Sequence, residues 1–275
     1  MSTRPALEDL IKLAVEAGRA IMAVRDEGCE ATNKSDGSPV TIADQRAEAI
    51  IEAGLKRLAP DAPMVGEEAV AEGRIPDTGA RFYCVDPLDG TRDFIAGETG
   101  EFTVNIALVE NRTPVVGVVF APATGELYAG EPGRALRGSF DGRSGELRTP
   151  IGPIHAGAKP QGPWRVIASR RSGKNAATDA FITALGESER LSSSSSIKFC
   201  RLAEGAADLY PRFGDVNEWD IAAGHAILSA AGGGVMLLDG APLAYGGREG
   251  SFLVHGFIAF ASAAAAGAAR KALAG

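Results

Sequence analysis

The residues Asp86-Pro87-Leu88-Asp89-Gly90-Thr91-Arg92-Asp93-Phe94 directly follow the apolar run Phe82-Tyr83-Cys84-Val85. The apolar run is typical of a strand, and the residues after it are typical of a tight turn. Pro87 can neither donate to a sheet nor continue a strand, and Asp and Gly are favoured in turns. The pattern therefore predicts that the carboxylates of Asp86 and Asp89 meet at one corner of a sheet.

A helix is expected to begin near Thr91, just after this turn. The free backbone N–H groups of Gly90 and Thr91 would then favour an anion. Carboxylates that suit a cation, beside amides that suit an anion, indicate a site for a metal ion and a phosphate. The motif alone also fits an ordinary turn without a ligand. An EF-hand is excluded because Leu88 and Gly90 stand where oxygen ligands are needed, and the aspartyl-phosphate route of haloacid dehalogenases needs an aspartate where Pro87 stands.

Length and composition indicate a chain with a substantial core and an acidic balance. Its 275 residues are 45% hydrophobic and carry a net charge of −7, which argues against a nucleic acid polymer as partner. The cysteines, Cys29, Cys84 and Cys200, lie far apart and are expected to be reduced thiols. No apolar run is long enough to span a membrane, so we expect a cytoplasmic protein without integral membrane association. Loose peripheral association with the membrane stays open, as does the oligomeric state, monomer or homodimer.

The first half of the chain is typical of two helices followed by an antiparallel sheet. Residues 7–24 have apolar positions at helical spacing, and Thr41 can cap a second helix that carries Asp44 in its first turn. Pro63 to Glu68 is expected to be a short strand that ends in paired acids. Further strands are expected at 102–109, 115–120, 127–129 and 135–137.

The segment from Thr149 to Trp164 is rich in Pro and Gly, lacks periodicity and is the expected domain boundary. Residues 1–150 would form a domain of a helix pair and an antiparallel sheet that carries most of the metal ligands. Residues 151–275 would form an α/β domain, because expected strands such as 164–168 alternate with expected helices such as 175–185. This second domain would contribute Asp220 and the residues that set specificity.

Several common catalytic patterns are absent from the sequence. It contains neither a G-x-S-x-G elbow nor a P-loop, and its histidines, His155, His225 and His255, lack the spacing of metal ligands. Carboxylates remain as the residues that carry chemistry. Oxygen ligands select Mg²⁺ or a similar ion, and Mn²⁺ stays open.

Three motifs occur together in a fixed order: Gly66-Glu67-Glu68, Asp86 to Thr91, and Trp219-Asp220-Ile221-Ala222-Ala223-Gly224. In these motifs the chain resembles the inositol-monophosphatase superfamily of lithium-sensitive, Mg²⁺-dependent phosphatases. Further segments are similar to one branch of it, the bacterial 3′(2′),5′-bisphosphate nucleotidases; they are residues 34–41, 100–108, 195–200 and 209–214. The resemblance runs from about residue 6 to about residue 260.

The resemblance implies a mixed α/β fold, a layered α-β-α-β-α sandwich of the inositol-monophosphatase and fructose-1,6-bisphosphatase type, with a site at the junction of the domains. It implies two or three Mg²⁺ ions per site, with ligands Glu67, Asp86, the Leu88 carbonyl, Asp89 and Asp220. Asp44, Glu67 and Thr91 would be catalytic. Thr91 with Glu67 would orient the attacking water, and Asp44 would help to hold a third ion or its waters. Glu68 would lie behind the ligands.

The resemblance also implies that the substrate is a small nucleotide bisphosphate. Lys198 and Arg212 would suit its second phosphate, since inositol-specific relatives resemble this segment with an apolar and an acidic residue at these places. The expected substrate-binding residues are Glu67, Asp89, Gly90, Thr91, Ser195, Ser196, Lys198, Arg212 and Asp220.

The leading hypothesis is removal of the 3′-phosphate from adenosine 3′,5′-bisphosphate, with 3′-phosphoadenylyl sulfate as a related substrate. The family resemblance implies a role in sulfur metabolism, where this reaction clears a by-product of sulfate assimilation. Two alternatives stay open: an inositol or sugar monophosphatase, and a non-catalytic regulator that binds phosphate or nucleotide.

Overall fold

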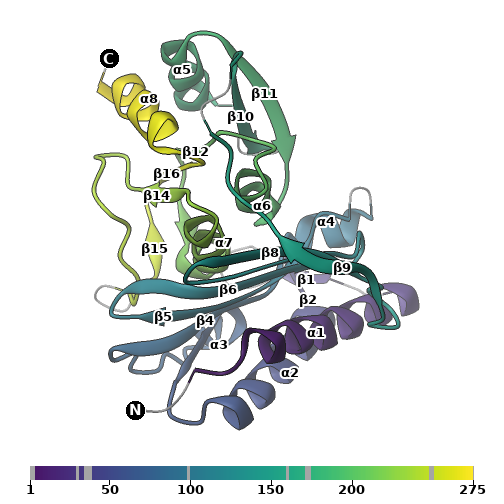
Figure 1. Ribbon diagram of the computed structural model, residues 1–275. Helices are drawn as coiled ribbons and strands as arrows, with labels where there is room; N and C mark the ends of the chain where they lie inside the picture. Colours follow the sequence, from purple (N-terminus) through teal and green to yellow (C-terminus); the bar gives the residue numbers. More distant parts are fainter. Residues whose placement is uncertain are drawn as a thin grey trace.

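The computed structural model describes residues 4–28, 31–33, 39–97, 100–158, 161–170, 175–247 and 251–274. Cys29 and residues 34–38 of the nucleotidase-like segment lie outside these ranges. The described elements stack in the order helices, sheet, helices, sheet, helices (Figure 1). This is the mixed α/β layered sandwich that the family resemblance implies.

Two amphipathic helices cover the outer face of the larger sheet (Figure 1). Helix α1 (Leu7–Glu27) buries one apolar face, and helix α2 (Ile42–Leu58) packs beside it. Helix α2 begins at a capping box, in which the Asp44 carboxylate accepts a hydrogen bond from the Thr41 N–H at 2.8 Å. The predicted second helix and its cap are confirmed, and the cap fixes the position of the Asp44 carboxylate.

The larger sheet has seven strands in the order β3-β4-β5-β6-β7-β8-β9. They are β3 (Met64–Gly66), β4 (Arg81–Asp89), β5 (Thr103–Glu110), β6 (Thr113–Ala121), β7 (Glu126–Glu131), β8 (Arg134–Phe140) and β9 (Leu147–Pro153). Neighbouring strands are antiparallel, except that β3 and β4 are parallel. The register of β4 with β5 shifts between Asp86 and Asp89, because Pro87 has no N–H to donate. The sequence predicts that the strand ends at Asp86, but β4 continues through Pro87 and pairs with β5 again at Asp89, so the predicted turn is an irregularity within the strand.

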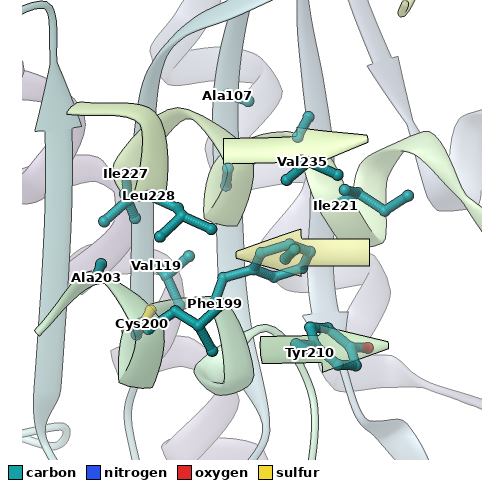
Figure 2. Packing of buried hydrophobic residues seen from close by; sticks show 14 of the residues in the cluster. Ala107, Val119, Phe199, Cys200, Ala203, Tyr210, Ile221, Ile227, Leu228 and Val235 are labelled. Atoms are coloured by element: carbon teal, nitrogen blue, oxygen red, sulfur yellow. The ribbon is translucent and has the colours of Figure 1, made fainter. Parts of the chain in front are cut away.

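Helices α6 (Ile197–Ala203) and α7 (Glu218–Ala230) lie between the two sheets (Figure 1). Their apolar side chains, among them Phe199 and Ile227, form the buried packing shown in Figure 2. Gly117 of β6 lets α7 approach the larger sheet closely, since a Cβ there would lie 2.2 Å from the carbonyl oxygen of Ala223. Helix α7 is therefore held against the sheet that carries Asp86.

The smaller sheet has five strands in the order β11-β10-β12-β16-β14. They are β10 (Trp164–Ser169), β11 (Ser188–Ser193), β12 (Leu209–Arg212), β14 (Gly234–Met236) and β16 (Phe257–Phe260). Helices α5 (Ala176–Leu185) and α8 (Ala263–Ala274) form the outermost layer beyond it (Figure 1). The described residues also form two short strand pairs: β1 (Ala31–Asn33) with β2 (Pro39–Thr41), and β13 (Val216–Asn217) with β15 (Leu253–Val254). Among the residues that the structure describes, no helix combines the length and hydropathy needed to cross a membrane.

Some details correct the expectations from the sequence. Glu67 and Glu68 do not end a strand but open helix α3 (Glu67–Ala71), since the buried Glu48 carboxylate accepts hydrogen bonds from the first turn of that helix. The segment 149–164 is partly ordered as strand, because β9 continues to Pro153 at the edge of the sheet. Strand β11 was not predicted, since its serines and charged residues show no apolar pattern. The division into domains 1–150 and 151–275 stays a prediction.

Candidate active site

Asp86 lies near the irregular end of β4 and is 1% exposed. Its Oδ1 accepts a hydrogen bond from the backbone N–H of Leu88 at 2.9 Å, which closes the turn around Pro87. Its Oδ2 is buried and has no hydrogen-bond partner among the described residues. A buried carboxylate oxygen without a donor costs free energy, so this atom indicates a place for a cation.

Carboxylates from three elements converge at Asp86. One oxygen each of Glu67 at the start of α3, Asp86 on β4 and Asp220 in the first turn of α7 lie within 4.8 Å of one another. Burial, followed by repulsion from Glu67, raises the pKa of Asp86 well above its ordinary value. Burial, followed by repulsion from Asp89, raises the pKa of Asp220 to about 7. Divalent cations relieve such repulsion, and a set of oxygen ligands fits Mg²⁺.

Thr91, the first residue of helix α4 (Thr91–Ala96), joins this cluster to Asp44. Its Oγ1 lies 3.0 Å from Asp44 Oδ1 and 3.1 Å from the Leu88 carbonyl oxygen, and its one hydroxyl proton can be donated to either acceptor. The other oxygen of Asp44 accepts from the N–H and the hydroxyl of Thr41, each at 2.8 Å. Burial raises the pKa of Asp44, although the hydrogen bonds from Thr41 and Thr91 oppose this change. The family resemblance implies that Thr91 acts with Glu67, and the structure adds that the Thr91 hydroxyl contacts Asp44 and Leu88.

Ser196 lies inside the carboxylate cluster and is 1% exposed. Its Oγ accepts a hydrogen bond from Asn105 Nδ2 at 2.9 Å, and lies 2.9 Å from the Asp220 carbonyl oxygen and 3.2 Å from Asp89 Oδ2. The hydroxyl therefore holds elements that carry carboxylates rather than facing open space. Asn105 was not predicted from the sequence, because its position in the middle of an apolar strand gives no sign of its partner.

A cavity of about 500 Å³ opens beside these residues. Apart from Ser196, every residue predicted to bind substrate lines it: Glu67, Asp89, Gly90, Thr91, Ser195, Lys198, Arg212 and Asp220. The cavity thus brings together acids from both halves of the chain and two cations from the second half.

The two cations of the cavity are held by backbone carbonyl groups. The Lys198 ammonium donates to the carbonyl of Ser195 and lies 5.2 Å from the ring centre of Tyr210. Burial lowers the pKa of Lys198 to about 8, although the nearby Asp89 opposes this change. The Arg212 guanidinium donates to the carbonyls of Gly214 at 3.2 Å and Asp215 at 2.7 Å. These contacts orient both side chains before any ligand binds.

Glu48 is a further buried acid near the site that the sequence did not single out. Its carboxylate accepts from the backbone N–H groups of Glu68 at 2.9 Å and Ala69 at 2.8 Å, and so holds the helix start that carries Glu67. A Cβ on Gly66 would lie 2.7 Å from Glu48 Oε2, which explains the glycine before the two acids. One signal was available: Glu48 follows Asp44 by four residues, on the same face of α2.

The layered sandwich and its buried carboxylate cluster define a protein of a phosphatase family. The model of the Inositol monophosphatase family matches residues 4–272, and the chain belongs to this family. It is 42% identical over 254 residues to the Escherichia coli (strain K12) protein named 3′(2′),5′-bisphosphate nucleotidase CysQ, a match that covers 91% of this chain and 98% of the relative.

Two further proteins are also similar to this chain. The crystal structure of CysQ from Bacteroides thetaiotaomicron is similar with a TM-score of 0.74 and 37% identity, covering 93% of this chain and 96% of that chain. The Aquifex aeolicus (strain VF5) protein named Fructose-1,6-bisphosphatase/inositol-1-monophosphatase is 31% identical over 257 residues, which cover 91% of this chain and 92% of the relative.

Proposed function

We propose that this chain is a Mg²⁺-dependent 3′(2′),5′-bisphosphate nucleotidase that converts adenosine 3′,5′-bisphosphate to AMP and phosphate. 3′-Phosphoadenylyl sulfate would be a related substrate. The observation that carries the proposal is that one cavity is lined both by the acids Glu67, Asp89 and Asp220 and by the cations Lys198 and Arg212. The names of the CysQ relatives support the same choice.

The acids would hold two or three Mg²⁺ ions. The ligands would be Glu67, Asp86, the Leu88 carbonyl, Asp89 and Asp220, and the unpartnered Asp86 Oδ2 supports this assignment. When bound, Mg²⁺ supplies a Lewis acid that lowers the pKa of water and offsets charge on phosphate oxygens. Because lithium sensitivity is typical of the family, we expect Li⁺ to inhibit at fixed Mg²⁺.

Thr91 and Asp44 would orient the attacking water. When Thr91 Oγ1 donates to Asp44 Oδ1, its lone pairs remain to accept a hydrogen bond from water in the cavity. Burial raises the pKa of Asp44, which makes this carboxylate a better proton acceptor. Glu67 lines the same cavity and completes the catalytic set.

Lys198 and Arg212 would bind the 5′-phosphate and leave the 3′-phosphate at the acids. A guanidinium presents a planar fork to phosphate oxygens, and an ammonium acts as a compact charge. Ser195 lines the cavity beside them, and the N–H groups of Gly90 and Thr91 would face the reacting phosphate. Ser196 would act through Asp89 and Asp220, which its hydroxyl joins.

The reaction would take place in the cytoplasm, in keeping with the free, buried thiols of Cys84 and Cys200. It would remove a by-product of sulfur metabolism, the role that the family resemblance implies.

A substrate panel tests the proposal. Phosphate release is measured from adenosine 3′,5′-bisphosphate, inositol 1-phosphate and fructose 1,6-bisphosphate, in Mg²⁺ and in EDTA. We expect the nucleotide to give the highest kcat/KM and EDTA to abolish release. Asp86→Asn should abolish it too with an unchanged circular dichroism spectrum, whereas the exposed control Asp239→Asn should match the wild type. Preference for inositol 1-phosphate or fructose 1,6-bisphosphate would overturn the nucleotidase assignment, and release from none of the substrates would favour a non-catalytic regulator.

A further inference from the structure

Residues 193–196, here called the serine segment, run from the last residue of β11 to the start of α6, and Ser194 and Ser195 line the cavity. Ser195 has a φ of +46°, in the left-handed region that residues other than glycine rarely adopt. Such a conformation persists only where the surrounding contacts impose it. In this conformation the Ser195 carbonyl accepts a hydrogen bond from the Lys198 ammonium.

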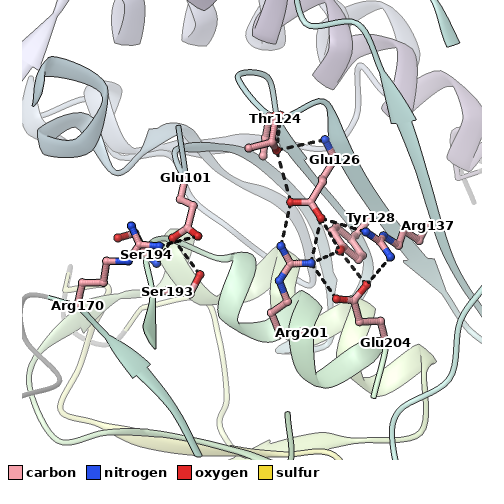
Figure 3. A network of polar contacts seen from close by, with 11 residues as sticks. Glu101, Thr124, Glu126, Tyr128, Arg137, Arg170, Ser193, Ser194, Arg201 and Glu204 are labelled. Carbon is pink, nitrogen blue, oxygen red and sulfur yellow. Dashed lines mark hydrogen bonds and ion pairs between the residues drawn. The ribbon is translucent and has the colours of Figure 1, made fainter. Parts of the chain in front are cut away.

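Glu101 contacts the serine segment from outside, at the two residues that precede Ser195. Its Oε2 accepts from the backbone N–H of Ser194 at 2.7 Å and from the hydroxyl of Ser193 at 3.1 Å. Its Oε1 lies 2.9 Å from Arg170 Nη2, so this ion pair fixes the position of the carboxylate beside the segment (Figure 3). Hydrogen bonds to a charged acceptor are stronger than neutral ones.

Glu101 and the serine segment come from different halves of the chain. Glu101 precedes β5 of the larger sheet, whereas the serine segment follows β11 of the smaller sheet. One carboxylate therefore joins the part of the chain with Asp86 and Asp89 to the wall that carries Ser195 and Lys198. In the proposed function these two parts bind the two phosphates of the substrate, so the carboxylate connects the two ends of the cavity.

We propose that Glu101 is a positioning residue for substrate recognition, which holds the serine segment so that Ser195 and Lys198 meet the non-reacting phosphate of a nucleotide bisphosphate. The inference rests on the proposed function. It adds a residue that does not line the cavity and that acts through Ser194.

A second network on the same helix layer offers a matched control. Glu126 of β7 receives both Nη atoms of Arg201 on α6, at 2.9 Å each, and Arg137 and Glu204 extend this network (Figure 3). The side chains of Glu101 and Glu126 are equally buried, at 19% and 20% exposure. Both carboxylates connect the first half of the chain to the second half, but Glu126 makes its bonds to residues outside the cavity lining.

The test compares KM and kcat of Glu101→Ala, Glu101→Gln, Arg170→Ala and Glu126→Ala in Mg²⁺. The substrates are adenosine 3′,5′-bisphosphate and adenosine 3′-monophosphate, which lacks the second phosphate. We expect Glu101→Ala to raise KM for the bisphosphate about tenfold or more with little change in kcat, and to leave KM for the monophosphate unchanged. Glu101→Gln and Arg170→Ala should have KM values for the bisphosphate between those of the wild type and Glu101→Ala, because each variant keeps an acceptor for the Ser194 N–H. These two variants still test the inference if Glu101→Ala fails to fold. Glu126→Ala should match the wild type.

Two results would overturn the inference while the proposed function stands: a wild-type ratio of the two KM values in all Glu101 and Arg170 variants, or an equal rise in Glu126→Ala. A wild-type enzyme that shows no preference for the bisphosphate would instead overturn the proposed function, and the inference with it.

Discussion

At the scale of single residues, the groups around each carboxylate decide its chemistry. Asp141 lies in a surface turn, where the backbone N–H groups of Ser144 and Arg143 donate to it and lower its pKa to about 2. Asp86 is buried beside Glu67, and its pKa is raised well above the ordinary value. The first aspartate is stable as an anion through its own turn. Asp86 becomes stable as an anion only when a cation, or a proton on a neighbouring carboxylate, offsets the repulsion within the cluster.

The proposed binding of the second phosphate gives a prediction at this scale. Lys198→Ala and Arg212→Ala should each raise KM for adenosine 3′,5′-bisphosphate about tenfold or more, matching the ~1.5–3 kcal/mol of a charged hydrogen bond. Slow hydrolysis of adenosine 3′-monophosphate should barely change. Steady-state kinetics on both substrates measures this, with Lys56→Ala on the exposed face of α2 as control. Wild-type KM in both variants would mean that these residues do not set specificity.

At the scale of elements, helix α7 belongs both to the core and to the site. Its first turn carries Asp220, whose Oδ2 accepts from the Asn217 N–H at 2.9 Å. Further along, His225 is 9% exposed, and its Nδ1 lies 3.0 Å from the Tyr245 hydroxyl. The titratable ring of His225 is thus buried in the same helix that carries Asp220, a proposed metal ligand.

This burial predicts how stability depends on pH. Burial lowers the pKa of His225 to about 4, whereas an unfolded histidine titrates near pH ~6.5. Between these values the unfolded chain binds the proton more readily than the folded protein does. His225 therefore contributes stability that is complete above pH ~6.5 and is lost as the pH falls toward about 4, on the order of 3 kcal/mol in all.

The variant His225→Gln isolates this contribution, because glutamine does not titrate and its amide can still bond Tyr245. Between about pH 7 and about pH 5, the free energy of unfolding in urea should fall by about 1–2 kcal/mol more in the wild type than in the variant. The exposed control His255→Gln should follow the wild type. Parallel pH profiles for wild type and His225→Gln would contradict the prediction.

At the scale of the whole molecule, the acidic cluster joins distant parts of the chain. Asp86 belongs to the larger sheet, and Asp220 belongs to the helix layer between the sheets (Figure 1). Because the same-sign charges repel, the protein without cations should be less stable than the protein with them.

We therefore expect Mg²⁺ to raise the midpoint of thermal unfolding. At a concentration 100 times Kd, binding adds ~2.7 kcal/mol, which corresponds to several degrees for a chain of this size. Asp86→Asn and Asp220→Asn should lose most of the shift, and Asp239→Asn should keep it. Scanning fluorimetry in EDTA and in Mg²⁺ measures the difference. An equal shift in Asp220→Asn would show that Mg²⁺ binds elsewhere.

Local patterns in the sequence were sufficient for much of the fold and for the main acids. The periodicity of α1 and the Thr41 cap of α2 each depend on residues within a few positions of one another, and both are confirmed. The strand end predicted at Asp86 is not found, because β4 pairs with β5 again at Asp89. The three motifs also selected Glu67, Asp86 and Asp220, which the structure brings together.

Contacts between distant residues required the tertiary structure. Thr91 meets Asp44 across 47 positions, and the Ser194 N–H meets Glu101 across 93. Other features also became visible only in the tertiary structure. They are the pKa of each buried acid, the left-handed conformation of Ser195, and the roles of Glu48 and Glu101. The physical reason is that burial and hydrogen bonding depend on atoms within a few ångströms in space, and packing brings those atoms from parts of the chain that no local pattern connects.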